Sequence, residues 1–128
     1  MDLGGIAKGY AGDEMLRVFG AHGCGRAMVA VSGDVVCGDG DWRVKLEASG
    51  ETLALRRCGA STSGDSVQRH IFDARTGVYV EGVWLVSVVA RSGMLADVLA
   101  TALRVLGEKE GQRLAARHGA KAWFRRLS

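Results

Sequence analysis

The chain has 128 residues, of which 48% are hydrophobic and 24% charged, and its formal net charge is +3. This length suits a single domain, and the composition excludes an intrinsically disordered chain. No apolar stretch reaches the roughly 18–20 residues that a membrane helix needs, and the first residues lack the zones of a signal peptide. Cys24, Cys37 and Cys58 are odd in number and lack CxxC spacing, which argues against a zinc site or a full disulfide framework.

Basic residues gather near the C-terminus, within residues 113–126. Such a cluster can bind nucleic acid or an acidic partner, or it can be the solvated face of a helix followed by a charged tail. The aromatic-and-basic strand pattern of an RNA-binding protein does not accompany the charges. We therefore expect a solvated face and no nucleic-acid partner.

The first predicted element is a helix over residues 6–19. Asp13 and Arg17 have the spacing of a surface ion pair, and Gly20 is expected to end the helix. Adjacent glycines precede it, and they let the backbone turn tightly and approach a ligand because they carry no Cβ. A loop of this kind normally follows a strand, and none precedes it here. We therefore expect the chain to be the later part of a larger protein.

Short strands come next, joined mostly by glycine turns. Residues 42–47 alternate between apolar and charged side chains and are expected to form a hairpin with residues 52–57. Residues 83–90 are almost continuously apolar and rich in β-branched side chains, which predicts a central strand covered on both faces. Two further short strands are expected over residues 27–32 and 35–37.

The C-terminal part is expected to hold two helices and a last strand. Ser92 and Gly93 open a helix over residues 94–106, and a second helix covers residues 108–117. Residues 121–126 are expected to close the sheet as an edge strand whose charges discourage further pairing. With hairpin-type connections prominent, the sequence predicts an α+β fold with a mixed or antiparallel sheet and packed helices, as one domain over residues 1–128.

Asp97 and Thr101 stand four residues apart in the predicted helix over residues 94–106. At this spacing their side chains lie about 5–6 Å apart on one helix face, close enough for both oxygens to reach one ion. Mg²⁺ prefers such oxygen ligands. The alternative is that Asp97, Thr101 and Arg104 form the solvated side of the helix, and the helical pattern alone favours it.

His70 and the pair Ser63-Gly64 also allow two interpretations each. An imidazole can take up a proton near neutral pH, but a histidine beside Ile71 and Phe72 is more often a structural residue at a strand end. Ser63 and Gly64 can line a ligand, or they can form a turn between two strands.

Four ordered segments resemble the motifs of one family, the FAD:protein FMN transferases of the ApbE family. They are residues 2–11 (DLGGIAKGYA), 61–65 (STSGD), 70–77 (HIFDARTG) and 96–103 (ADVLATAL). The resemblance covers nearly the whole chain and the C-terminal part of the family's domain. It implies an ApbE-like domain related to the T-fold, N-terminally truncated, which lacks the half that helps to build the flavin pocket.

By the same resemblance, Asp97 and Thr101 match the magnesium-binding helix of the family, Ala-Asp-x-x-x-Thr-Ala. A backbone carbonyl of the Gly-rich loop completes that site in the family, and we assign it to Gly5. The resemblance thus implies Mg²⁺ as a cofactor. It favours the metal site over the solvated helix face that the helical pattern alone favours.

The flavin-binding residues implied by the resemblance are Gly4, Gly5, Lys8, Ser63 and Gly64. Lys8 is expected to neutralise phosphate charge near a helix N-terminus, which itself favours anions. His70 is expected to assist catalysis.

Two positions depart from the family pattern. Ala74 stands where proline is usual, so the turn loses a preset φ angle, and Asp73, Thr76 and Gly77 are expected to shape that turn. Residues 32–34 read Ser-Gly-Asp where Gly-Gly-Asp is more usual, and the Cβ of Ser32 restricts the backbone where a glycine is free.

The resemblance implies Mg²⁺-dependent transfer of FMN from FAD to a threonine or serine hydroxyl of a target flavoprotein, with release of AMP. The implied partners are FAD, the target flavoprotein, and the missing N-terminal half or a protein that supplies it. The alternative is a non-catalytic flavin-binding or interaction domain, or an inactive relic that needs a partner. Relatives work at the outer side of the bacterial inner membrane, so a periplasmic parent protein is expected.

Overall fold

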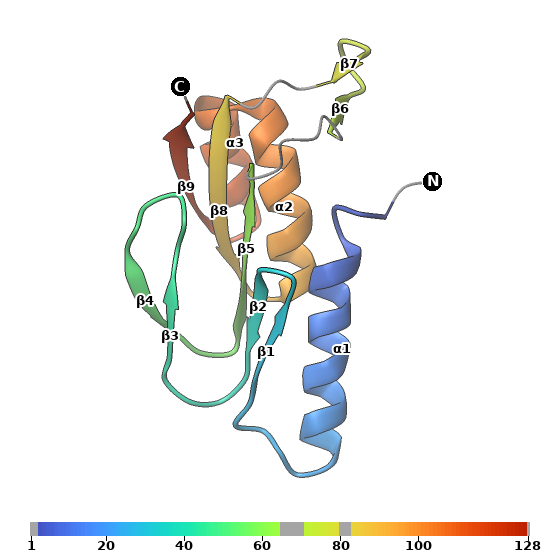
Figure 1. Cartoon of the computed structure of the whole chain (residues 1–128), viewed down its shortest axis with the longest axis vertical. Helices are drawn as coiled ribbons and strands as arrows, with labels where there is room; N and C mark the ends of the chain where they lie inside the picture. Colours follow the sequence, from blue (N-terminus) through green and yellow to red (C-terminus); the bar gives the residue numbers. More distant parts are fainter. Residues whose placement is uncertain (1–2, 65–70, 80–82, 128) are drawn as a thin grey trace.

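The computed structural model describes residues 3–64, 71–79 and 83–127. A five-stranded antiparallel sheet with the order β1-β2-β5-β8-β9 forms its centre (Figure 1). The helices pack on one side of this sheet, the β3–β4 hairpin lies on the other, and the small β6–β7 hairpin projects beyond α2. The elements are α1 (Ala7–Ala21), β1 (Met28–Val31), β2 (Asp34–Cys37), β3 (Trp42–Lys45), β4 (Thr52–Leu55), β5 (Cys58–Ser63), β6 (Phe72–Asp73), β7 (Val78–Tyr79), β8 (Trp84–Ala90), α2 (Gly93–Leu106), α3 (Glu108–Arg117) and β9 (Lys121–Arg126).

This architecture confirms the α+β prediction, the three helices, the β3–β4 hairpin and the basic edge strand β9. The strand β8 lies between β5 and β9 and is buried over most of its length, as its apolar run predicts. No helix within residues 3–64, 71–79 and 83–127 is both long enough and apolar enough to cross a membrane.

The strand β5 was not predicted, because its sequence of small and polar residues lacks a strand pattern. Its burial depends on small size: a Cβ on Gly59 would lie 2.5 Å from the backbone of Gly93. The absence of a side chain lets α2 pack directly on the strand. The small residues of β5 therefore reflect close contact between α2 and the sheet. They do not show the alternating hydrophobicity by which a strand is predicted.

The helix α1 ends later than predicted. Gly20 lies inside it, whereas Gly23 adopts a positive φ of 84° just beyond its end. The amides of Gly23 and Cys24 donate to the carbonyls of Gly20 and Phe19, which is the bonding pattern of a Schellman cap. The left-handed conformation, and not the first glycine along the chain, decides where the helix stops.

Asp13 does not pair with Arg17, as the spacing predicted. Arg17 forms its ion pair with Glu14 at 3.0 Å, and the Asp13 carboxylate instead accepts hydrogen bonds from the amides of Gly93 and Met94 at 2.7 and 2.9 Å. These amides lie in the first turn of α2, where backbone N–H groups lack helical partners and the helix dipole favours negative charge. Asp13 thereby ties the start of α2 to α1.

Replacing Asp13 with alanine is expected to lower the free energy of unfolding by about 1–2 kcal/mol, since two N-terminal amides of α2 lose their acceptor. Urea unfolding followed by circular dichroism measures this change. Glu14→Ala is the matched control on the same helix, because its ion pair with Arg17 is exposed, and it is expected to change stability by under about 0.5 kcal/mol. Equal effects of the two substitutions would contradict the capping role.

Candidate functional site

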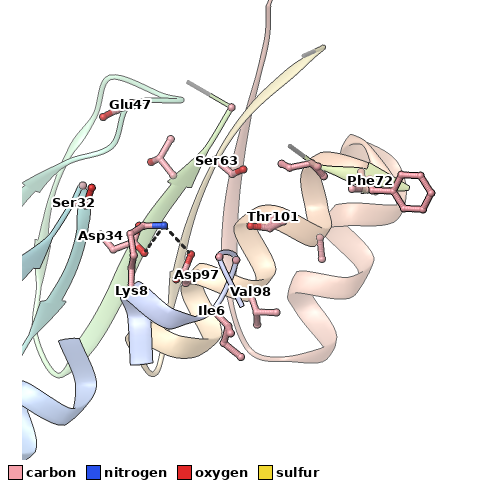
Figure 2. Close-up of a pocket in the computed structure, with 18 residues that line it drawn as sticks. Ile6, Lys8, Ser32, Asp34, Glu47, Ser63, Phe72, Asp97, Val98 and Thr101 are labelled. Atoms are coloured by element: carbon pink, nitrogen blue, oxygen red, sulfur yellow. Dashed lines mark ion pairs between the residues drawn. The ribbon is translucent and has the colours of Figure 1, made fainter. Parts of the chain in front are cut away.

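A pocket of about 880 Å³ opens where α1, α2, the β1–β2 turn and the end of β5 meet (Figure 2). Its volume lies in the range of pockets that bind cofactors, roughly 300–1,000 Å³. Every predicted site residue that the structure describes lines it, namely Gly4, Gly5, Lys8, Ser63, Gly64, Asp97 and Thr101. His70 lies outside the described residues, and its neighbours Ile71 and Phe72 line the pocket. Three of the four sequence motifs supply the seven predicted residues, and Ile71 and Phe72 come from the fourth.

Lys8 lies between two buried carboxylates at the polar side of this pocket. Its Nζ is 4.0 Å from Asp34 Oδ2 and 3.9 Å from Asp97 Oδ1 (Figure 2). Asp34 and Asp97 are each 3% exposed, whereas the Lys8 side chain is more than one-third exposed. One partly solvated cation thus faces two carboxylates from different elements, β2 and α2.

Asp34 is the functional candidate that the sequence did not reveal. Its Oδ1 accepts a hydrogen bond from the Ser61 hydroxyl at 2.7 Å, while its buried Oδ2 has no hydrogen-bond partner within the described part of the chain. Burial, together with the nearby Asp97, raises the pKa of Asp34 to about 6 against the lowering effect of Ser61 and Lys8. The sequence does carry one indication of this role, because Asp34 is an acidic residue at the start of the otherwise apolar strand β2.

Asp97 is not on a solvated helix face, and neither is Arg104, which is 5% exposed. The alternative interpretation, in which these residues form the solvated side of the helix, is therefore wrong for both Asp97 and Arg104. Asp97 Oδ2 accepts a hydrogen bond from the Gly9 amide at 2.9 Å. This bond orients the carboxylate toward Lys8 and the loop before α1.

The residues around Asp97 fit a magnesium ion in their chemistry. Thr101 lies one turn further along α2, and a Cβ on Gly5 would lie 3.2 Å from Thr101 Oγ1, so the Gly-rich loop passes close to the threonine side chain. A carboxylate, a hydroxyl and a loop carbonyl are oxygen donors of the kind that Mg²⁺ binds. Within the described ranges no three His, Cys, Asp or Glu side chains form a group that could hold a metal ion.

Part of the pocket lining is apolar. It comes from Ile6, Val98, Ala102, Val105 and Ile71, together with the exposed side chain of Phe72. A pocket that combines apolar and charged lining residues suits a ligand that carries both a planar ring system and phosphate groups.

Ser63 and Gly64 lie at the end of β5, not in a free turn. Ser63 is the last residue of the strand, paired with Val86, and Gly64 follows it with φ at 132°. A Cβ at Gly64 would lie 2.6 Å from the carbonyl oxygen of Trp84. Only glycine fits there, so the chain can leave the sheet directly at the pocket wall.

The turn between β6 and β7 is shaped by the residues that were predicted to shape it. Asp73 accepts a hydrogen bond from the Arg75 amide at 2.9 Å, and the Gly77 amide donates to the Asp73 carbonyl at 2.9 Å. Gly77 has a positive φ of 74°. The side chain of Asp73 therefore supplies turn geometry where the usual proline is absent.

Ser32 occupies the left-handed region with φ at 49°, a conformation that its Cβ disfavours, and Gly33 follows with φ at 94°. Ser32→Gly is expected to raise the free energy of unfolding by about 0.5–1 kcal/mol, because glycine adopts this conformation without a steric cost. Gly33→Ala is the opposing control and is expected to lower it by a similar amount. Chemical denaturation of both variants measures the difference, and a destabilised Ser32→Gly would show that the serine side chain supplies an interaction that outweighs the strain.

Comparison with known proteins matches residues 1–124 to the ApbE family. The chain belongs to the ApbE family. It is 35% identical to an FAD:protein FMN transferase of Rhodobacter capsulatus over 98% of the chain, and 28% identical to that of Escherichia coli K12 over 93%. The chain spans 28% and 40% of the lengths of these two relatives.

Solved structures of ApbE proteins have the same fold. The flavinyl transferase ApbE of Pseudomonas stutzeri, in its apo form, superimposes with a TM-score of 0.85 at 32% identity, covering 97% of this chain and 44% of that one. The ApbE protein of Thermotoga maritima gives a TM-score of 0.82 at 30% identity, covering 98% and 48%. The chain thus spans slightly less than half of the length of these two solved structures.

Proposed function

We propose that this ApbE-family chain carries the phosphate-binding and metal-binding part of an FAD:protein FMN transferase site. The observation that carries the proposal is the convergence of Lys8, Asp34, Asp97 and Thr101 on one pocket that also has apolar lining residues. The names of the relatives support FAD as substrate and a protein as acceptor.

The proposed reaction exchanges one phosphorus–oxygen bond for another. The phosphoanhydride of FAD breaks, a phosphoester forms between the FMN phosphorus and a threonine or serine hydroxyl, and AMP leaves with the bridging oxygen. The proton of the acceptor hydroxyl goes to a base, for which His70 is the candidate from the sequence motif. An unassisted hydroxyl is a weak nucleophile, so this proton transfer is needed for the reaction.

The other residues of the proposed site would bind the metal ion and the phosphate groups of FAD. Asp97, Thr101 and the Gly5 carbonyl would hold Mg²⁺, which when bound neutralises charge on the pyrophosphate and on the leaving phosphate. Lys8 would neutralise further phosphate charge, because it is only loosely paired with its carboxylates at 3.9–4.0 Å. The Gly4–Gly5 loop and the Ser63–Gly64 segment would bring backbone amides close to the ligand.

The test uses a hybrid enzyme in which residues 1–124 of this chain replace the matching segment of the E. coli relative. With FAD, Mg²⁺ and the acceptor protein of that relative, the hybrid is expected to attach FMN covalently and release one AMP for each FMN attached. Mass spectrometry of the acceptor and chromatography of AMP measure the two products. Thr101→Val is expected to slow the transfer, while Glu47→Gln, on the exposed rim of the same pocket, leaves it unchanged.

The alternative of a flavin-binding domain without transfer gives a different result in the same assay. The hybrid would then retain FAD through chromatography, release no AMP and leave the acceptor unmodified. Release of FMN and AMP without attachment to the acceptor would instead indicate hydrolysis of FAD.

A further inference from the structure

The helix α1 exposes its large apolar side chains. Its buried residues are only Gly9 and Gly12, whereas Met15, Val18 and Phe19 are 46%, 46% and 44% exposed. Together with Ala11 they have the spacing i, i+4, i+7 and i+8, which places them along one side of the helix. We call these four residues the α1 stripe.

The sheet edge beside α1 is also apolar and open. The strand β1 has the sequence Met-Val-Ala-Val, and among the described strands it pairs only with β2. The opposite edge, β9, carries Lys121, Arg125 and Arg126, which protect it against unwanted pairing. An uncharged edge of this kind is normally covered by another segment of a protein.

The α1 stripe and the β1 edge belong to one side of the molecule. A Cβ at Gly12 would lie 2.5 Å from a Val36 methyl and 3.9 Å from one of Val31, so α1 rests directly on the β1–β2 pair. Figure 1 shows α1 running alongside β1 at the end of the sheet away from β9. An apolar helix face next to an open strand is the combination that a packed interface requires.

We propose that this α1–β1 surface is the interface with the remaining half of the ApbE fold, the part of the relatives that this chain does not span. One strand of that half would pair with β1, and its apolar side chains would cover the α1 stripe. The occupant is inferred from length, because the chain covers 28–41% of the length of its curated relatives and 44–50% of the solved ApbE structures. The proposal rests on the proposed function in one respect: α1 begins at the pocket with Lys8, so docking along α1 completes the pocket wall.

Cysteine accessibility tests this surface without relying on activity. Met15→Cys and Arg17→Cys are each made in a Cys24→Ser background, since Cys24 is exposed and would react. Arg17 is the matched control, because it lies on the same helix outside the stripe with its side chain 68% exposed. The alkylation rate with a maleimide is measured for the 128-residue chain and for the hybrid with the E. coli relative.

Alkylation of Met15→Cys is expected to be at least about tenfold slower in the hybrid than in the isolated chain, and that of Arg17→Cys to change by less than about twofold. Equal reactivity of Met15→Cys in both proteins overturns the proposal. Protection already present in the isolated chain, rising with concentration and accompanied by a dimer mass in light scattering, overturns it as well, because the occupant is then a second copy.

Co-expression gives a second test if the hybrid does not fold. The tagged chain is produced together with the remaining part of the E. coli relative as a separate polypeptide. Co-purification that Met15→Glu abolishes and Arg17→Glu preserves supports the interface, and absence of co-purification overturns it. Both readouts report packing alone, so a hybrid that protects Met15→Cys but transfers no FMN refutes the proposed function and leaves the interface standing.

Discussion

Asparagine in place of Asp97 is expected to lower the rate of FMN transfer by the hybrid roughly 10²–10³-fold, because the proposed magnesium site would lose its charged ligand at the point where transition-state charge must be neutralised. The fold is expected to persist. The asparagine carbonyl can still accept the hydrogen bond from the Gly9 amide, and the substitution relieves the repulsion between Asp97 and Asp34.

Two measurements separate a metal-binding role from a general loss of structure. The Mg²⁺ concentration that gives half-maximal transfer is expected to rise in Asp97→Asn, whereas circular dichroism stays that of the unsubstituted hybrid. Glu47→Gln removes a carboxylate from the rim of the same pocket and is expected to change transfer by less than about twofold. Full activity of Asp97→Asn would exclude Asp97 from the proposed magnesium site.

Alanine at Gly9 is expected to lower the free energy of unfolding by roughly 2–4 kcal/mol, the upper part of the range for overpacking. A Cβ there would lie 2.0 Å from the Gly93 carbonyl oxygen and 2.8 Å from Asp97 Cβ. A backbone carbonyl cannot rotate away, so α1 and α2 would have to separate. The Gly9–Asp97 hydrogen bond would stretch with them, and the site would lose its geometry together with stability.

The control for this prediction lies in the same helix. A Cβ at Gly20 meets nothing within 4 Å, so Gly20→Ala is expected to raise the free energy of unfolding by about 0.5–1 kcal/mol through helix propensity alone. Urea unfolding of the 128-residue chain compares the two variants. A Gly9→Ala variant as stable as Gly20→Ala would contradict the close contact of the helices.

Local sequence patterns predicted most elements of this fold. The apolar run of β8, the alternation in β3 and the cap residue Ser92, whose hydroxyl accepts from the Leu95 amide at 3.1 Å, all depend on residues a few positions apart. The sequence does not predict β5, because its residues must be small for α2 to pack on the strand. This requirement comes from a helix that is distant in the chain.

The structure brings the predicted site residues that it describes to one pocket, and here too the predictable part depends on neighbouring positions. Asp97 and Thr101 were found from their spacing and from the family motif, since both residues lie on one helix. Asp34 was missed, because its significance depends on facing Lys8 and Asp97 across the pocket. The spacing predicts a pair between Asp13 and Arg17, yet Asp13 accepts hydrogen bonds from two amides at the start of α2 instead.

The sequence by itself determined the family, the helices, most strands and seven of the residues that line the pocket, because motifs and periodicity are properties of neighbouring positions. Only the tertiary structure decided which carboxylates are buried, which cation faces them and which apolar helix face stays open. Burial and electrostatic interaction depend on surfaces brought together from distant segments, and their strength is set by the exclusion of water, which no local pattern encodes.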